Sequence, residues 1–183
     1  MIRVTTGTAK GRRLALPKNH KLTAVKEIVK SAIFSIIGEQ ITNASCLDLY
    51  AGSGNMGIEA LSRGAAACDF VDEARAAIET VEKNLQTCRF NEYGTAIQDD
   101  SLRFLANTQN LYDLIFADPY YAEPNHKYLM KLGLAKLKPN GVLFLLTSAE
   151  QPYPEPPLEL ADKVELGTRK YGKTLLTMLT SKQ

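Results

Sequence analysis

The feature that most constrains the fold of this chain is an alternation between short apolar runs and segments with helical periodicity. The apolar runs have the length of β-strands and occur at residues 45–50, 68–71, 94–98, 111–117 and 141–147. Helical patterns separate them, so consecutive strands need crossover connections, and strands joined in this way are parallel. The sequence therefore predicts a parallel, doubly wound α/β sheet.

The two ends of the chain depart from this alternation. Residues 2–6 and 12–16 predict a short N-terminal β-hairpin, and runs at 162–169 and 173–180 predict a closing antiparallel hairpin. By analogy at the level of the fold, a terminal antiparallel pair after five parallel strands is typical of the methyltransferase variant of this sheet. Nicotinamide-binding folds usually continue with further parallel units.

We therefore expect a Rossmann-like class I methyltransferase fold with a seven-stranded, mostly parallel sheet. At 183 residues the chain has the length of one domain. Residues 1–183 are predicted to form a single methyltransferase domain, in which a basic N-terminal hairpin or arm over residues 1–22 precedes a catalytic core over residues 23–183.

The net charge of +2 hides an uneven distribution of charge. Residues 1–30 contain eight Lys or Arg and one acidic residue, whereas the remaining 153 residues contain 14 basic and 19 acidic groups. A basic segment on a mildly acidic body favours a polyanionic partner, because Lys and Arg neutralise phosphates. A solvated surface is the alternative that charge alone leaves open.

Several classes of protein are disfavoured by what the sequence lacks. No apolar run approaches the roughly 20 residues of a membrane span, and no apolar stretch of a secretory signal follows Met1. The three cysteines show no CxxC spacing, and only two histidines accompany them. We therefore expect no metal site and a cytoplasmic protein in a reducing compartment, with Cys46 and Cys68 as core residues.

A glycine loop (residues 52–57, Gly-Ser-Gly-Asn-Met-Gly) follows the first parallel strand and opens a helix. Glycines allow the backbone to turn tightly beneath a ligand, although a plain strand-to-helix turn would also use them. Asp72 ends the next strand, where an acid can accept hydrogen bonds from ribose hydroxyls. Asp48 favours a ligand with an amino group and a sulfonium, because it would repel the pyrophosphate of a dinucleotide.

Two further acids, Asp99 and Asp100, follow the third parallel strand. An acid at this place can accept a hydrogen bond from the exocyclic amine of adenine. Asp99, Asp100 and Ser101 are also good capping residues, so the N-cap of a solvated helix is the alternative interpretation.

The fourth parallel strand ends in Asp118-Pro119-Tyr120-Tyr121. A carboxylate and the proline carbonyl can accept both hydrogens of an exocyclic amine, which localises the amine lone pair toward a methyl donor. An aromatic ring can stack on a base that has left its helix. A β-turn opened by Asp-Pro, with tyrosines on the core, is the alternative that the tetrapeptide alone leaves open.

Taken in order, these motifs resemble the RsmD-type methyltransferases, which modify guanine N2 in bacterial small-subunit rRNA. The resemblance covers nearly the whole chain. It rests on residues 3–14 (RVTTGTAKGRRL), 47–65 (LDLYAGSGNMGIEALSRGA), 70–73 (FVDE), 99–105 (DDSLRFL), 113–121 (DLIFADPYY) and 169–174 (RKYGKT).

The resemblance implies S-adenosylmethionine as cofactor, and a role for three sets of residues. The cofactor would be contacted near Asp48, Ala51, Gly52, Ser53, Gly54, Asp72 and Asp100. The guanine amine would meet Asp118, Pro119 and Tyr121, and RNA would be held by Arg3, Lys10, Arg12 and Arg13. The implied partner is 16S rRNA or a small-subunit assembly intermediate, bound by a monomer without metal.

The chain departs from the family pattern at two places. Tyr120 stands where the family usually has proline, and residues 22–28 (LTAVKEI) replace a stretch that usually carries arginines. Three other functions therefore stay open. They are methylation of adenine in DNA or of a protein amide on the same fold, RNA binding without catalysis, and a nicotinamide-dependent oxidoreductase.

Overall fold

The computed structural model describes residues 2–17, 27–119, 126–152 and 154–182. In chain order the elements are β1 (Ile2–Arg3), β2 (Arg13–Leu14), α1 (Glu27–Ile37), η1 (Gly38–Ile41), β3 (Ser45–Leu49), α2 (Asn55–Ser62), β4 (Ala67–Asp72), α3 (Arg75–Cys88), β5 (Gly94–Gln98), α4 (Ser101–Asn107), β6 (Tyr112–Ala117), α5 (His126–Leu134), β7 (Leu137–Ser148), η2 (Leu158–Lys163), β8 (Val164–Tyr171) and β9 (Thr174–Ser181).

Seven of these strands form one sheet in the order β5-β4-β3-β6-β7-β9-β8. The first five run parallel, and β9 pairs antiparallel with both β7 and β8. This confirms the predicted doubly wound sheet and its closing hairpin. The chain steps outward from β3 in one direction to β4 and β5, and later in the other direction to β6 and β7, so the topological switch point lies between β3 and β6.

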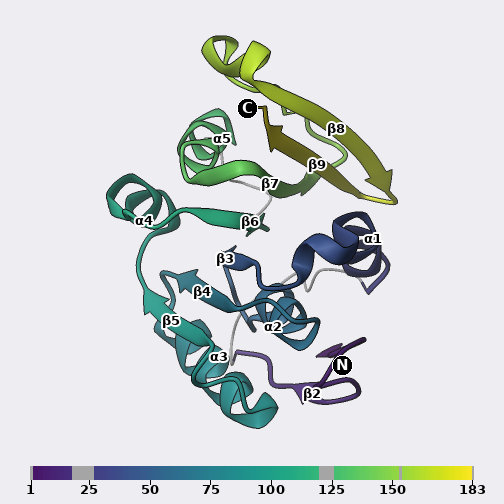
Figure 1. The fold of residues 1–183 in the computed structure, drawn as a ribbon, viewed down its shortest axis with the longest axis vertical. Coiled ribbons are helices and arrows are strands. Elements are labelled where there is room, and N and C mark those ends of the chain that lie inside the picture. Colours follow the sequence, from purple (N-terminus) through teal and green to yellow (C-terminus); the bar gives the residue numbers. More distant parts are fainter. Residues whose placement is uncertain (1, 18–26, 120–125, 153, 183) are drawn as a thin grey trace.

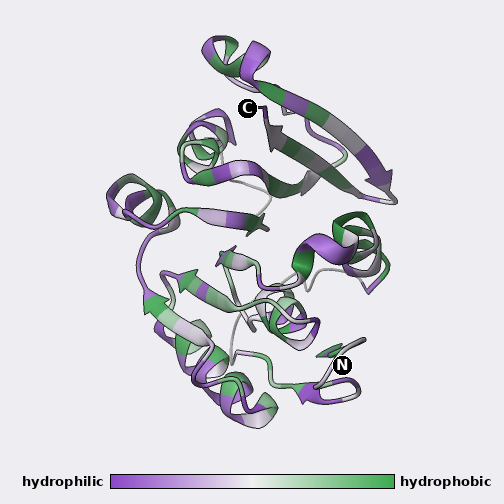
Figure 2. Ribbon diagram, in the orientation of Figure 1, coloured by the Kyte–Doolittle hydropathy of each residue, from purple (hydrophilic) through white to green (hydrophobic). Residues whose placement is uncertain are grey.

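Helices cover both faces of the sheet (Figure 1). One apolar layer joins side chains of α1, α2 and α3 to one face, and it includes Ile33, Ile58 and Val81. A second layer joins α4 and α5 to the other face through Leu105 and Leu129. Figure 2 shows the hydrophobic residues concentrated on the strands and on the inner sides of the helices, whereas the end of β8 is hydrophilic.

The strand boundaries differ from the predicted ones mainly at β7. This strand begins at Leu137 rather than near residue 141, because Leu137 pairs with Tyr112 before the register shifts. The N-terminal hairpin is also shorter than predicted, with only Ile2 opposite Leu14 and Arg3 opposite Arg13. Val4 still donates to the Arg12 carbonyl and accepts from the Gly11 N–H, and from Thr5 onward the backbone bonds with α2 instead.

The three cysteines are buried and free, which confirms Cys46 and Cys68 as core residues and adds Cys88 to them. Among the residues that the structure describes, no group of three His, Cys, Asp or Glu side chains could hold a metal ion. None of the described helices is long and apolar enough to cross a membrane.

Candidate active site at the carboxyl edge of the sheet

Three acids from three adjacent strands meet at the switch point, and we call Asp48, Asp72 and Asp118 the carboxyl cluster. Asp48 lies in β3 opposite Phe70 of β4 and Phe116 of β6. Asp72 and Asp118 lie two residues beyond these partners, and residues two apart in a strand share a face. All three side chains therefore project to the α1–α3 face, at the edge where doubly wound sheets bind ligands.

The glycine loop leaves β3 through a left-handed backbone. Tyr50, Gly52 and Gly54 have φ values of 55°, 56° and 74°, and only the two glycines adopt them without strain. Gly54 is also the N-cap of α2. The third glycine serves packing rather than a ligand, since a Cβ on Gly57 would lie 2.3 Å from the Phe70 ring.

Asp48 is buried, and its Oδ2 atom accepts a hydrogen bond of 2.8 Å from the backbone N–H of Gly57. Burial raises the pKa of this carboxyl to about 8, against the opposing effect of the Gly57 hydrogen bond, and the nearby charges of Asp118 and Asp72 raise it further. The carboxyl therefore holds the start of α2 and also adds to a region of unbalanced negative charge.

Asp72 holds the glycine loop from the neighbouring strand. Its Oδ2 accepts from the N–H of Gly52 at 2.9 Å, and its Oδ1 accepts from the N–H of Ala74 at 2.9 Å. A carboxylate has about four lone-pair positions, so capacity remains for hydroxyl donors of a ligand. Asp72 therefore lies beside the glycine loop, and its contact with a ribose stays a prediction.

Asp118 and Pro119 lie where β6 ends. Asp118 is half-buried and Pro119 is buried, and the loss of water around the Asp118 carboxyl raises its pKa to about 7. Tyr120 and Tyr121 lie outside the described residues, so the predicted role of Tyr121 stays a prediction. Asp118 is near enough to Asp48 for its charge to raise the pKa of that carboxyl, and Pro119 follows Asp118 in the chain.

Asp100 is the N-cap of α4, as the alternative interpretation had it. The Arg103 N–H donates to its Oδ1 at 2.8 Å, and Asp99 forms an ion pair with the Arg103 side chain. Asp100 is exposed, one strand farther from β3 than Asp72. Capping leaves other lone pairs of the Asp100 carboxylate free. The predicted contact of Asp100 with the cofactor stays a prediction.

The four predicted RNA-binding residues fall into two groups. Arg3 makes an exposed ion pair of 3.7 Å with Glu27, and the Arg12 guanidinium donates to the Thr87 carbonyl at the end of α3. Lys10 and Arg13 are exposed and make no side-chain hydrogen bond or ion pair within the described part of the chain. The structure thus leaves two of the four cations available to a partner.

The N-terminal segment (residues 2–17) is docked on the core rather than free. Ser62 at the end of α2 donates to the Thr6 carbonyl at 2.6 Å and accepts from the Ala9 N–H at 3.0 Å. The fit is close, because a Cβ on Gly7 would lie 1.7 Å from the Ser62 carbonyl oxygen. The basic residues therefore lie on a segment that is hydrogen-bonded to the end of α2.

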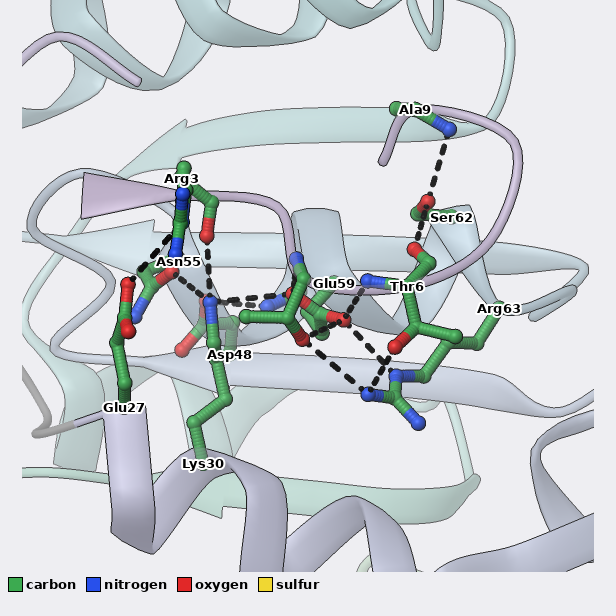
Figure 3. Close-up of polar contacts among 12 residues, drawn as sticks. Arg3, Thr6, Ala9, Glu27, Lys30, Asp48, Asn55, Glu59, Ser62 and Arg63 are labelled. Carbon is green, nitrogen blue, oxygen red and sulfur yellow. Dashed lines mark hydrogen bonds and ion pairs between the residues drawn. The ribbon is translucent and has the colours of Figure 1, made fainter. Parts of the chain in front are cut away.

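A buried ion network beneath this segment escaped the sequence analysis (Figure 3). The side chains of Lys30 and Glu59 are fully buried and form an ion pair of 3.1 Å. Glu59 also accepts from Thr5 and Thr6 of the N-terminal segment, at 2.7–3.0 Å, and from Arg63 at 2.9 Å.

Each charge in this network has several partners. Burial lowers the pKa of Lys30, against the opposing effect of Glu59. Burial alone would raise the pKa of Glu59, but hydrogen bonds from Thr5 and the charge of Lys30 hold it below its ordinary value. In the sequence Glu59 is the one charged residue of the stretch that forms α2, but a lone charge does not by itself predict a buried pair.

Comparisons with known proteins agree with this architecture. A protein-family model described as "Conserved hypothetical protein 95" matches residues 2–180. The protein YlbH of Bacillus subtilis, whose name assigns it provisionally to the rRNA methyltransferases, is 35% identical over 178 residues, which cover 94% of this chain and 95% of that protein.

A second relative is named ribosomal RNA small subunit methyltransferase D and comes from Haemophilus influenzae. It is 32% identical over 160 residues, covering 82% of this chain and 81% of its own length. Among solved structures, YhhF of Escherichia coli, named provisionally as a methyltransferase, superposes with a TM-score of 0.86 at 24% identity, covering 99% of this chain and 98% of that one. The fold is the class I methyltransferase fold.

Proposed function

The chain belongs to the family described as conserved hypothetical protein 95, and on that basis we propose that it is an S-adenosylmethionine-dependent methyltransferase. Its proposed acceptor is the exocyclic N2 amine of a guanine in small-subunit (16S) rRNA. Two relatives named for rRNA methylation support the substrate class, and one of them is named for the small subunit. The observation that carries the activity is the carboxyl cluster beside the glycine loop.

The residues of this edge fit the proposed cofactor. S-adenosylmethionine carries a sulfonium and an ammonium, and it supplies an electrophilic methyl group when bound. Three carboxyl groups on adjacent strands would attract such a cation when they ionise. Burial and, to a smaller extent, the charges of Asp118 and Asp72 raise the pKa of Asp48, and a cation bound beside it would favour the ionised form. Ala51, Gly52, Ser53 and Gly54 would lie along the ligand, with Asp72 accepting from its hydroxyls.

Asp118 and Pro119 would hold the acceptor. The amine lone pair of guanine is delocalised into the ring, so the nitrogen is a poor nucleophile. The Asp118 carboxylate and the Pro119 carbonyl can each accept one amine hydrogen, which turns the lone pair toward the methyl donor. Fixed positions for both reactants remove much of the translational and rotational cost of the reaction, and the amine proton can leave to water.

The proposed partner is 16S rRNA or a small-subunit assembly intermediate. We expect Lys10 and Arg13, with Arg3 and Arg12 beside them, to contact its phosphates. A ribosomal substrate implies a cytoplasmic enzyme, and we expect it to act as a monomer without metal.

The mechanism is tested by Asp118→Asn and Asp118→Ala, measured as methyl incorporation into small subunits that lack the modification. We expect activity to fall at least 100-fold while binding of S-adenosylhomocysteine, measured by calorimetry, is retained. Asp113→Asn is the matched control, because Asp113 lies at the other end of β6 and pairs with Lys138. Full activity of the Asp118 variants would contradict the proposed mechanism.

The acceptor is tested separately. Mass spectrometry of rRNA from cells with and without this protein should show the loss of one methylated guanine in 16S rRNA. Small subunits, DNA and protein offered side by side would identify an adenine or amide acceptor instead. Failure to bind S-adenosylmethionine would favour an RNA-binding protein without catalysis, and binding of NAD would favour an oxidoreductase.

A further inference from the structure

Lys30 joins the first strand of the N-terminal segment to the glycine loop. From α1, its ammonium donates to the Arg3 carbonyl at 2.9 Å and to Oδ1 of Asn55 at 2.9 Å, while Glu59 balances its charge (Figure 3). Arg3 belongs to β1, and Asn55 is the first residue of α2. A fully buried side chain with three fixed partners transmits a shift of one partner to the others.

Asn84 joins the far end of the segment to the same loop. It lies in α3 with 1% of its surface exposed. Its Oδ1 accepts from the N–H of Ala15 at 2.8 Å, and its Nδ2 donates to the carbonyls of Ala15 at 3.0 Å and Ser53 at 2.8 Å. One amide group thus joins Ala15, the residue directly after β2, to Ser53 of the glycine loop.

The two bridges meet the loop on either side of one residue. Lys30 reaches Asn55 and Asn84 reaches Ser53, so Gly54 lies between the two attachment points. Gly54 has a φ of 74° and starts α2, and a Cβ there would lie 3.2 Å from Phe70. The loop therefore has little space in which to move unless both bridges move with it.

The bridges also flank the basic residues. Arg3 and Ala15 are the backbone attachment points, and the turn between them carries Lys10, Arg12 and Arg13. A partner that immobilises this turn would hold the two backbone positions from which Lys30 and Asn84 reach the loop.

We propose that Lys30 and Asn84 are positioning residues that couple the binding of rRNA on the N-terminal segment to the binding of cofactor at the glycine loop. The inference rests on the proposed function, because that function supplies both ligands. Each ligand would order the segment and the loop together, so the second ligand to bind would meet a loop that is already held. Linkage then requires each ligand to raise the affinity for the other by the same factor.

The substitution Asn84→Asp tests this coupling while it leaves the size and shape of the side chain nearly unchanged. Aspartate has nearly the same size and can still accept from the Ala15 N–H, but even when protonated it has one hydrogen, so it cannot donate to the carbonyls of Ala15 and Ser53 together. Thr80→Val is the matched control, since Thr80 is a buried polar residue one turn earlier in α3 whose hydroxyl donates only to Ala76 of its own helix.

The experiment is a binding cycle with S-adenosylhomocysteine, which cannot react, and small subunits that lack the modification. Equilibrium dialysis would give the affinity for labelled S-adenosylhomocysteine with and without saturating subunits, and filter binding would give the affinity for subunits with and without S-adenosylhomocysteine. We expect a reciprocal increase of about fivefold or more in the wild-type protein, a typical allosteric coupling. The factor should fall below about twofold in Asn84→Asp and be kept in Thr80→Val.

The coupling factor is the affinity for one ligand in the presence of the other divided by the affinity in its absence. This factor distinguishes a positioning role of Asn84 from a structural one. A purely structural role of Asn84 would lower both affinities and leave their coupling factor unchanged, which would overturn the inference. A factor of one in the wild-type protein would overturn it without any variant. If the wild-type protein binds S-adenosylhomocysteine but neither binds nor methylates small subunits, the proposed substrate fails first, and the coupling fails with it.

Discussion

The Lys30–Glu59 pair and the carboxyl cluster both bring charged side chains into the interior, but only the first is balanced. Glu59 has Lys30 and Arg63 as cationic partners and two threonines as donors, and its pKa lies below the ordinary value. In the carboxyl cluster, burial raises the pKa values of Asp48 and Asp118 to about 8 and about 7, and the charges of Asp118 and Asp72 add to the rise at Asp48.

The difference in charge balance indicates a structural role for the Lys30–Glu59 pair and a functional role for the carboxyl cluster. A buried pair with all its hydrogen bonds made can hold two elements together, here the N-terminal segment and the core. Acids that the fold leaves unbalanced lower stability when they ionise, and such groups are typical of sites where a ligand supplies the missing charge. The following predictions test whether the two groups of charges behave in these different ways.

The largest expected effect is the loss of one partner from the balanced pair. Glu59→Gln keeps the size of the side chain but leaves Lys30 buried without its counter-charge, so the free energy of unfolding should fall by about 3–5 kcal/mol. Asp118→Asn should leave it unchanged or raise it at pH 8, because it removes a half-buried carboxylate whose ionisation the loss of surrounding water disfavours. Urea denaturation of both variants at pH 8 makes the comparison, and equal losses would contradict it.

The next effect concerns how closely the N-terminal segment fits above the balanced pair. Gly7 and Gly11 both have a φ of 84°, but a Cβ at Gly7 would meet the Ser62 carbonyl at 1.7 Å, whereas a Cβ at Gly11 would meet nothing within 4 Å. Alanine at either position has the strain of a left-handed backbone, roughly 1–2 kcal/mol. Gly7→Ala should lower the free energy of unfolding by about a further 1–3 kcal/mol, from the clash.

Thermal denaturation of the two glycine variants gives this difference directly. Because the backbone angle is the same, the Gly11→Ala variant serves as the control for strain. Equal losses in the two variants would show that the segment can lift from α2 at little cost in free energy.

The carboxyl cluster could be predicted from the sequence better than the ion network could. Asp48, Asp72 and Asp118 each lie in or directly after an apolar strand, and parallel strands bring such positions to one edge. Lys30 and Glu59 are 29 residues apart in helices of unknown orientation, and a lone Lys or Glu in a helix usually faces water. Nothing local marks Asn84 either, since its partners are the backbone atoms of two distant segments.

The pH dependence of cofactor binding is the third prediction. An acid whose pKa is raised in the free protein binds a proton that must leave when a cation binds beside it. Affinity for S-adenosylmethionine should therefore rise with pH, by about tenfold between pH 7 and 8.5 for a carboxyl of pKa about 8. Conversely, Asp48 and Asp118 stabilise the unliganded protein when they are protonated. This contribution to the free energy of unfolding is present below about pH 4 and is lost as pH rises through their pKa values of about 8 and about 7.

Calorimetry at several pH values measures this slope and the protons released. Asp48→Asn should remove most of the pH dependence, and Asp113→Asn should keep it, because the pKa of Asp113 is lowered by its hydrogen bonds with Lys138 and Ser45 despite partial burial. A flat profile in the wild-type protein would mean that these acids are not beside the cofactor's charges.

The smallest effect concerns exposed charges, which are neither balanced by the fold nor buried by it. Each phosphate contact made by such a cation contributes about 0.7–0.9 to the slope of log affinity against log salt. Lys10→Gln with Arg13→Gln should lower that slope by about twice this amount and leave cofactor affinity unchanged in the absence of RNA. Arg12→Gln should lower it less, because Arg12 already donates to the Thr87 carbonyl. If Arg12→Gln lowers the slope by half as much as the double variant does, each cation counts equally and docking of the segment does not decide which cations meet the RNA.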